Sequence, residues 1–337
     1  MIPMPLPRRL LGHDLSVSAI GYGAMGLSEF YGATDTGIID TMLRAVIDAG
    51  VTLIDTADVY GRGHNEEIIG QALRAAPAEA RAAVRIATKC GIDRPLDAAY
   101  ARRINNQPDY IRACCDASLH RLGVERIDLF YIHRVDPETD IAATMQVLAD
   151  LAQAGKIAHV GLCEVSAATL RRAHAVFPVT AVQSEYSLWT RDAEDEVLPT
   201  TQALGIGFVA YSPLGRGFLT GRYKSTETLA DDDFRRSNPR FQGDNLERNL
   251  ELLAKVEEFA AQHGVTPAQI ALAWLLAQGD HIVAIPGTRS PARLAENLGA
   301  LSVRLSAEDL EALSAIWTRG ATAGDRYTAE GMKGVNV

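Results

Sequence analysis

The stretch Val51-Thr52-Leu53-Ile54-Asp55 is a short apolar run that ends in a carboxylate, and the same arrangement occurs twice more along the chain. Lys89 follows the run 84–88, and His133 follows the run 127–132. Because the apolar residues of a parallel strand lie in a core, the last position presents its side chain at the rim, where a ligand can reach it. One such end alone is typical of a solvated strand terminus, but three successive ends with an acid, an amine and an imidazole indicate chemistry.

Eight short apolar runs alternate with amphipathic segments along the chain. They cover residues 18–20, 51–54, 84–87, 127–132, 157–161, 179–182, 206–210 and 282–285. Residues 36–49 are typical of the segments between them, since apolar residues recur there at helical spacing and Gly50 follows as a stop. This alternation predicts an α/β protein with a parallel sheet, and eight units predict one closed (β/α)₈ TIM barrel domain over residues 1–337.

Segments outside these units predict additions to the barrel. Residues 9–17 hold Gly12-His13-Asp14 between apolar residues, which predicts an N-terminal hairpin that caps the barrel bottom. Residues 214–245 have few apolar anchors and form a longer loop than a compact domain usually holds without a function, so we predict a lid there. Ser306 and the acidic residues after it predict the start of a C-terminal extra helix, and a tail without periodicity begins at Gly320.

The composition is that of a soluble globular protein. Of 337 residues, 47% are hydrophobic and 22% are charged, which permits a large core. The net charge of −9 argues against nucleic acid or an anionic membrane surface as a partner, and no run approaches the ~20 apolar residues of a membrane span. Four cysteines without metal-ligand spacing fit a reducing compartment, so we predict a cytoplasmic location. The sequence predicts no particular oligomeric state.

Two motifs suggest other classes of protein. Residues 21–26, Gly-Tyr-Gly-Ala-Met-Gly, satisfy the dinucleotide fingerprint of an open-sheet NAD-binding domain, but no helical pattern opens at the motif, so we favour glycines that approach a ligand. His64-Asn65-Glu66-Glu67 offers metal-binding residue types at a spacing that fits a helix start better. There Asn65 is the expected cap, and the acids complement the helix dipole. We predict no metal site.

Tyr60, in the loop after Asp55, completes a group of four polar residues. A tyrosine is a poor acid at neutral pH, with an ordinary pKa of about 10, but a nearby ammonium such as that of Lys89 stabilises its phenolate. Asp55 can pair with Lys89, and His133 can orient a substrate oxygen. Such a site protonates an oxygen on which negative charge develops, as the reduction of a carbonyl by hydride requires, and a cofactor must supply that hydride.

Over nearly its whole length the chain resembles the aldo-keto reductases, a family of NADP-dependent oxidoreductases, in their bacterial and plant branch. The matching segments are residues 28–32, 55–61, 64–67, 87–89, 131–133, 184–189, 211–217 and 285–289. The resemblance implies reduction of aldehydes and ketones to alcohols with NADPH. It implies that Tyr60 is the general acid, that Lys89 and Asp55 tune its pKa, and that His133 positions the carbonyl.

The same resemblance implies which residues bind NADPH/NADP+. Cys163, Glu164 and Gln183 are expected at the nicotinamide carboxamide, and Tyr211 is expected to stack on the ring. Cys163 stands where the family has a serine, and since a thiol is a weaker donor, a role as small core filler stays open for it. The other expected cofactor contacts are Gly23, Ser212, Pro213, Leu214, Gly215, Gly217, Ile285, Gly287, Thr288, Arg289, Arg293, Glu296 and Asn297.

Thr288, Arg289 and Arg293 are expected near the adenosine 2′-phosphate, which favours NADPH, with solvated helix arginines as the alternative. Loops at the barrel mouth shape specificity, so candidate substrate-pocket residues, each of which could equally be core, are Met25, Phe30, Tyr31, Trp189 and the tail. The partner is a small-molecule carbonyl or alcohol. An alcohol or sugar dehydrogenase that works in the oxidative direction stays open, as does a nucleotide-sensing regulatory barrel.

Overall fold

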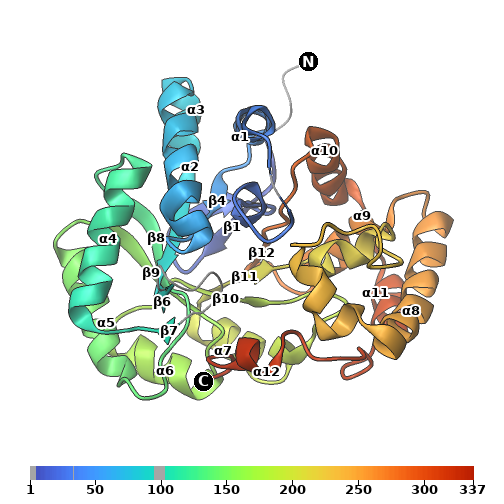
Figure 1. Cartoon of the computed structure of the whole chain (residues 1–337). Helices are drawn as coiled ribbons and strands as arrows, with labels where there is room; N and C mark the ends of the chain where they lie inside the picture. Colours follow the sequence, from blue (N-terminus) through green and yellow to red (C-terminus); the bar gives the residue numbers. More distant parts are fainter. Residues whose placement is uncertain (1–4, 33, 95–102) are drawn as a thin grey trace.

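The computed structural model describes residues 5–32, 34–94 and 103–337. Eight parallel strands form one sheet, and helices cover its outer side (Figure 1). In the order in which they pair, the strands are β3 Tyr22–Gly23, β4 Leu53–Asp55, β5 Arg85–Cys90, β8 Ile127–Ile132, β9 Ile157–Cys163, β10 Ala181–Glu185, β11 Gly207–Tyr211 and β12 Ile282–Ala284. The predicted (β/α)₈ barrel is therefore confirmed.

The sheet closes between its first and last strands. Ile20 forms a parallel bridge with Ala284, and the Gly21 N–H donates to the Ala284 carbonyl at 2.8 Å. The first barrel strand begins later than the run 18–20 that we predicted, because Ser18 still pairs with Arg8 in the N-terminal hairpin. A Cβ on Gly23 would lie 2.8 Å from the Ile285 carbonyl, so a glycine is needed where the two strands meet.

The dinucleotide-fingerprint alternative is wrong for residues 21–26. The short helix η1 Met25–Leu27 is followed by a loop, and α1 begins only at Thr36, so in the described part of this segment no α-helix opens at the glycines as the fingerprint requires. Gly21 approaches the backbone of the neighbouring strand, since a Cβ there would lie 3.0 Å from the Leu53 carbonyl. Its role in the fold is thus to let strands pack closely.

The described α-helices are α1 Thr36–Asp48, α2 His64–Ala75, α3 Ala78–Ala83, α4 Pro108–Leu122, α5 Ile141–Gln153, α6 Ala167–Val176, α7 Val197–Leu204, α8 Gly243–Gln262, α9 Pro267–Leu276, α10 Pro291–Gly299, α11 Ala307–Ile316 and α12 Ala329–Met332. They differ in how they begin: α1, α5, α6, α9, α10, α11 and α12 have a side-chain N-cap, whereas α2, α3, α4, α7 and α8 begin without one. The predicted extra helix is α11, whose N-cap Ser306 forms a capping box with Asp309. None of the described helices combines the length and the apolar character needed to cross a membrane.

The expected cap of α2 is wrong. The helix begins at His64 after Gly63, and Asn65 lies inside its first turn, fully buried. Its side chain accepts from the Thr56 hydroxyl at 2.7 Å and donates to the Ala24 carbonyl at 2.9 Å. Asn65 therefore joins three segments beneath the barrel mouth, because a buried amide finds its partners in the fold and not at its own helix end.

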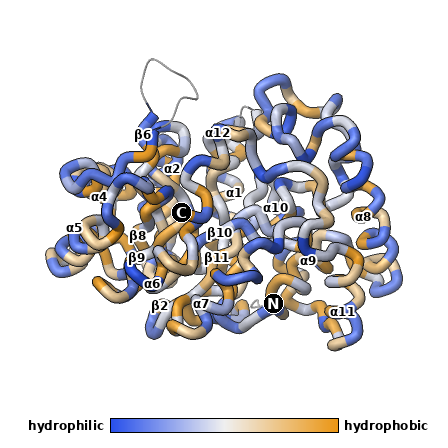
Figure 2. The backbone as a smooth tube through the Cα atoms, turned by 90° about the horizontal axis from the view of Figure 1, so that it is seen from below, coloured by the Kyte–Doolittle hydropathy of each residue, from blue (hydrophilic) through white to orange (hydrophobic). Residues whose placement is uncertain are grey.

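The core has an outer layer between sheet and helices and an inner layer inside the barrel. Apolar stretches run through the strands, whereas the outer loops are largely hydrophilic (Figure 2). The predicted hairpin, β1 Arg8–Leu11 and β2 Leu15–Ser18, contributes Leu11, Leu15 and Val17 to the inner layer, where they pack with Leu53 and Leu129. The hairpin thus closes the lower end of the barrel and leaves the upper end for the site.

Replacement of Leu11 by alanine is expected to lower the free energy of unfolding by about 2–5 kcal/mol, because a fully buried side chain would leave a cavity in the barrel floor. Urea unfolding followed by circular dichroism measures the change. Leu10→Ala is the matched control, since Leu10 is the preceding residue of the same strand and is 52% exposed. Equal stability losses in the two variants would contradict the hairpin's role as a plug.

Candidate active site

Asp55, Tyr60, Lys89 and His133, called the tetrad below, lie together at the upper ends of neighbouring strands. Asp55 ends β4, Lys89 is the next-to-last residue of β5, and His133 follows β8 directly. Lys89 is fully buried, and its Nζ lies 2.5 Å from Asp55 Oδ1 and donates to the Thr56 carbonyl at 2.7 Å. Gln183 of β10 donates to Asp55 Oδ2 at 2.7 Å, so both carboxylate oxygens have partners. A buried ion pair needs such completeness, because each unmet polar atom adds a desolvation cost.

Tyr60 lies against this ion pair. It begins the short helix η2 Tyr60–Gly63, and the Lys89 Nζ is 5.2 Å from the centre of its ring. The Tyr60 and His133 rings meet edge to face, with centroids 5.8 Å apart and an interplanar angle of 84°. The Tyr60 phenol, the Lys89 ammonium and the His133 imidazole thus lie together, although they come from η2, β5 and the residue after β8.

Burial governs the protonation of the group. It raises the pKa of Tyr60 to about 12, although the Lys89 ammonium pulls that pKa down. Burial opposes the charge of Lys89, yet the Asp55 carboxylate and Tyr60 outweigh it and raise the pKa of Lys89. Lys89 therefore stays an ammonium and Tyr60 stays a phenol at neutral pH. We expected a lowered pKa for Tyr60; the contribution of Lys89 has that sign but is smaller than the desolvation.

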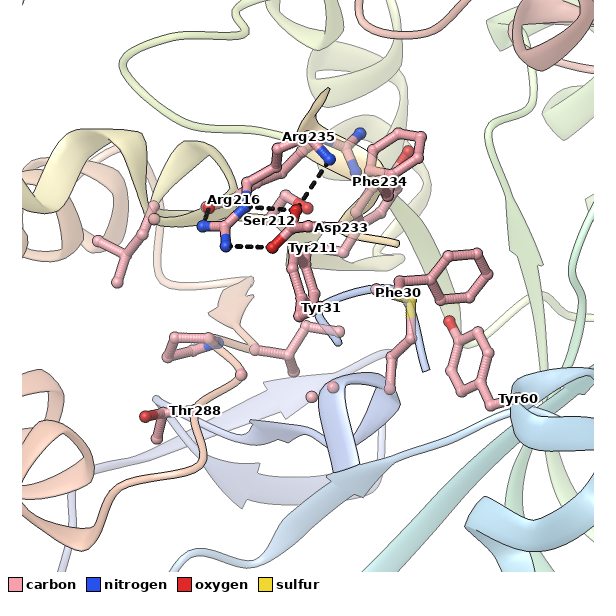
Figure 3. A pocket seen from close by; sticks show the side chains of 18 of the residues that line it. Phe30, Tyr31, Tyr60, Tyr211, Ser212, Arg216, Asp233, Phe234, Arg235 and Thr288 are labelled. Atoms are coloured by element: carbon pink, nitrogen blue, oxygen red, sulfur yellow. Dashed lines mark hydrogen bonds and ion pairs between the residues drawn. The ribbon is translucent and has the colours of Figure 1, made fainter. Parts of the chain in front are cut away.

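A cavity of about 1180 Å³ opens above the tetrad. It is larger than the ~300–1,000 Å³ of most ligand pockets. Most residues expected to touch cofactor or substrate line it, and Figure 3 shows several of them facing one another. These are Gly23, Met25, Phe30, Tyr31, Asp55, Tyr60, His133, Cys163, Gln183, Tyr211, Ser212, Pro213, Leu214, Gly217, Ile285, Gly287, Thr288, Arg289, Arg293, Glu296 and Asn297.

Four of the expected residues lie behind the cavity wall. Lys89 is covered by its partners, and Glu164 accepts from the Arg326 guanidinium at 3.1 and 3.2 Å. Trp189, expected in the substrate pocket, stacks on Phe218 with centroids 4.2 Å apart. A Cβ on Gly215 would lie 2.3 Å from Trp189, so the indole supports the loop at Gly215 from behind. We therefore place Trp189 in the aromatic core and not in the substrate pocket.

The loop after β11 has the geometry of an anion-binding turn. Ser212, Gly215, Arg216 and Gly217 all have positive φ angles, between 47° and 90°. Successive N–H groups in such backbone form a concave set of donors that suits phosphate oxygens. A Cβ on Gly217 would lie 2.7 Å from the Tyr223 ring, so a side chain would fill the turn. Within the loop, the Gly215 and Gly217 N–H groups donate to the Ser212 and Leu214 carbonyls at 2.8 and 3.0 Å, so these bonds fix the turn where the sequence predicts the pyrophosphate.

The two arginines expected at the 2′-phosphate differ in the structure. Arg289 donates to the carbonyls of Gly26, Tyr31 and Gly32 at 2.6, 3.1 and 2.7 Å, and so holds the loop after β3. Arg293 is exposed in the first turn of α10, on the cavity wall. Of these two arginines, Arg293 therefore presents its charge where a ligand can reach it without breaking the three carbonyl bonds of Arg289.

The predicted lid, residues 214–245, folds over the cavity in three short helices, η4 Gly215–Thr220, η5 Phe234–Ser237 and η6 Pro239–Phe241. Asp233 accepts from Arg235 Nε at 2.9 Å and Nη2 at 2.7 Å, as Figure 3 shows. The Arg235 guanidinium lies 3.9 Å from the centre of the Tyr223 ring. The charged cluster in the sequence indicated the lid but not these pairings.

Several residues of the cavity wall were not named individually from the sequence, and Tyr327 and Arg134 are two of them. Tyr327 shares a 2.8 Å hydrogen bond with Tyr211, and Arg134 follows His133 directly. The tail was predicted as part of the substrate-pocket wall, but without periodicity it gave no signal for Tyr327 in particular. Arg134 could have been found, because it is a charged residue just after the end of a barrel strand, the position that drew attention to its neighbour.

Cys163 and the acidic residues at the start of α2 do not indicate thiol or metal chemistry at the site. Burial raises the pKa of Cys163 to about 12, so this cavity-wall residue stays a thiol and is not a nucleophile at neutral pH. Among residues 5–32, 34–94 and 103–337, no three His, Cys, Asp or Glu side chains are placed to hold a metal ion. Glu66, a candidate ligand by sequence, instead binds Arg121 Nη2 at 2.6 Å and the Thr88 hydroxyl at 2.6 Å.

Comparisons with known proteins agree with this geometry. The family model described as "Aldo/keto reductase family" matches residues 19–318. The structure of the glycerol dehydrogenase AKR11B4 from Gluconobacter oxydans superposes with a TM-score of 0.82 at 31% identity, over 92% of this chain and 94% of that one. The thermostable aldo-keto reductase Tm1743, solved with the inhibitor epalrestat, superposes with a TM-score of 0.73 at 27% identity, over 92% and 100%.

Proposed function

The chain belongs to the aldo/keto reductase family, and we propose that it reduces aldehydes and ketones to alcohols with NADPH, with Tyr60 as the general acid. The observation that supports this most is the buried Lys89–Asp55 ion pair beside Tyr60, at the floor of a cavity large enough for a dinucleotide and a small substrate. We propose the cytoplasm as its location.

The cavity wall fits the cofactor. The positive-φ backbone from Ser212 to Gly217 suits a pyrophosphate, Arg293 suits a further phosphate, and Gln183 lies near the tetrad. NADPH, when bound, supplies the hydride. Gln183 already donates to Asp55, so in this proposal it joins the cofactor subsite to the ion pair. The role of Cys163 is limited to a weak S–H donor.

Each tetrad residue then has a definite part. Tyr60 holds its proton at neutral pH, as a general acid must, because burial raises its pKa to about 12. As negative charge develops on the substrate oxygen, Tyr60 gives up the proton and the Lys89 ammonium stabilises the phenolate. Asp55 keeps Lys89 charged and in position. His133, edge to face with Tyr60, holds the substrate oxygen near the phenol.

One observation favours a second direction. The neighbour at 31% identity is a glycerol dehydrogenase. The same residues would serve alcohol oxidation if the Tyr60 phenolate, stabilised by Lys89, accepts the proton of the alcohol while NADP+ takes the hydride. We therefore propose oxidation of alcohols or polyols with NADP+ as the alternative. A third possibility is a nucleotide sensor with slow turnover, and the assay below distinguishes it from the two enzymes.

Tyr60→Phe is expected to lower kcat for carbonyl reduction by about 10²–10⁴-fold, the usual contribution of a general acid. Cofactor affinity should stay within about twofold, because the loss affects only the proton-transfer step. NADPH absorbance against a panel of aldehydes and ketones, and NADP+ reduction with alcohols and glycerol, measure both directions. Tyr110→Phe, outside the cavity wall, is the matched control. NADPH binding by the wild type without turnover in either direction would refute the enzyme proposal and favour a sensor.

Arg293→Ala is expected to raise the KM for NADPH by roughly 10–100-fold, since a hydrogen bond to a charged group contributes about 1.5–3 kcal/mol. The KM for NADH should hardly change, because NADH lacks the 2′-phosphate. Initial rates with both cofactors check this. Arg304→Ala, which removes an exposed arginine after α10, is the control. A parallel rise for both cofactors would contradict a 2′-phosphate contact.

A further inference from the structure

Arg134 is a buried guanidinium on the cavity wall without an acidic partner. Its exposure is 6%, and its Nη1 donates to the His133 carbonyl at 2.7 Å. Its Nε is buried and has no hydrogen-bond partner in the described part of the chain. The charge persists, since burial opposes it but the surrounding phenols and Glu164 raise the pKa of Arg134. Glu164 is itself taken by Arg326.

The other buried arginines around the cavity are paired with carboxylates. Arg216 lies 3.0 Å from Glu185, Arg235 lies 2.7 Å from Asp233, and Arg326 lies 3.1 Å from Glu164. Arg134 has no such ion pair among residues 5–32, 34–94 and 103–337. A buried charge without a counter-ion is costly, so an anion in the cavity would stabilise Arg134.

Arg134 lies at the catalytic end of the cavity. It follows His133, whereas the turn at 212–217 and the residues 288–293 form the end expected to hold phosphates. Its backbone carbonyl accepts from Asn106 at 3.1 Å, and a Cβ on Gly334 would lie 3.5 Å from the Arg134 Cβ, so the tail packs on its stem. The guanidinium is thus held in place before a ligand arrives, next to the residue that would orient the substrate oxygen.

We propose that Arg134 binds a carboxylate of the substrate, so that the preferred substrates are oxo acids or hydroxy acids and not neutral carbonyl compounds. A hydroxyl or an ester would leave the charge of Arg134 unmatched, whereas a carboxylate in the cavity neutralises it. The proposal rests on the proposed function for its reaction but names the substrate class. A phosphate ester presents similar anionic oxygens, so the test includes one.

The kinetic test compares oxo acids with their methyl esters. 4-Oxobutanoate and methyl 4-oxobutanoate differ little except in the charge, and shorter and longer homologues vary the distance to the carbonyl. We expect kcat/KM for the best acid to exceed that of its ester by at least about tenfold, the size of one charge-assisted contact. Arg134→Met should lose most of this ratio, and Arg134→Lys should keep part of it. Arg126→Met is the matched control, since Arg126 is exposed at the opposite end of β8.

Two results overturn the proposal: equal kcat/KM for acid and ester across the series, or a higher value for glyceraldehyde 3-phosphate than for every oxo acid. A binding measurement separates this failure from that of the proposed reaction. Calorimetry with butanoate, which cannot react, should show binding to the NADP+-loaded wild type that weakens at least about tenfold in Arg134→Met. If no carbonyl is turned over but this difference is found, the anion subsite stands without the reductase; equal binding refutes the subsite.

Discussion

The buried ion pair between Lys89 and Asp55 is the interaction on which the site depends. Two charges removed from water are stable only where every remaining donor and acceptor is met. Here the Thr56 carbonyl accepts a second hydrogen bond from Lys89, and the Gln183 amide donates to the second oxygen of Asp55. Lys89 lies in β5 and Gln183 lies in β10, so the ion pair and its partners require a closed barrel. Closure in turn requires a glycine at position 23, where the first and last strands meet. The ion pair at the upper rim therefore depends on the close packing where the first and last strands meet.

The roof of the cavity depends on contacts between segments that are distant in the sequence. The Arg216 guanidinium lies 5.0 Å from the centre of the Phe234 ring and 4.7 Å from that of Tyr327. It also lies 3.0 Å from Glu185 at the end of β10. One arginine therefore joins the anion-binding turn, the lid, the tail and the barrel. These contacts hold the lid and the tail against the barrel, around the cavity.

The sequence predicted the barrel because eight apolar runs and the segments between them follow simple periodicities. It also predicted which strand ends meet, since parallel strands share one rim, and this explains why Asp55, Lys89 and His133 lie together. It failed where a polar side chain has partners across the fold. Asn65 was expected as a helix cap and is instead buried, and Trp189 packs behind the wall.

For the same reason, the sequence could not predict what Arg289 and Arg134 contact. A sequence shows that Arg289 and Arg134 are charged but not what their guanidinium groups contact. Arg289 is occupied by three backbone carbonyls, and Arg134 has a buried Nε without a partner among the described residues. Local patterns predict elements and their ends, whereas the use of a long side chain is decided by tertiary contacts that no local pattern contains.

The most direct test of the account is Lys89→Met, a replacement of similar length without the charge. Pre-steady-state mixing of the NADPH-loaded variant with an aldehyde measures the hydride-transfer step itself, and fluorescence titration measures cofactor binding. We expect a transfer rate lowered by at least about 10²-fold with cofactor affinity nearly unchanged, because the ammonium acts on the charge that develops in the transition state. A transfer rate within a few-fold of wild type would contradict it.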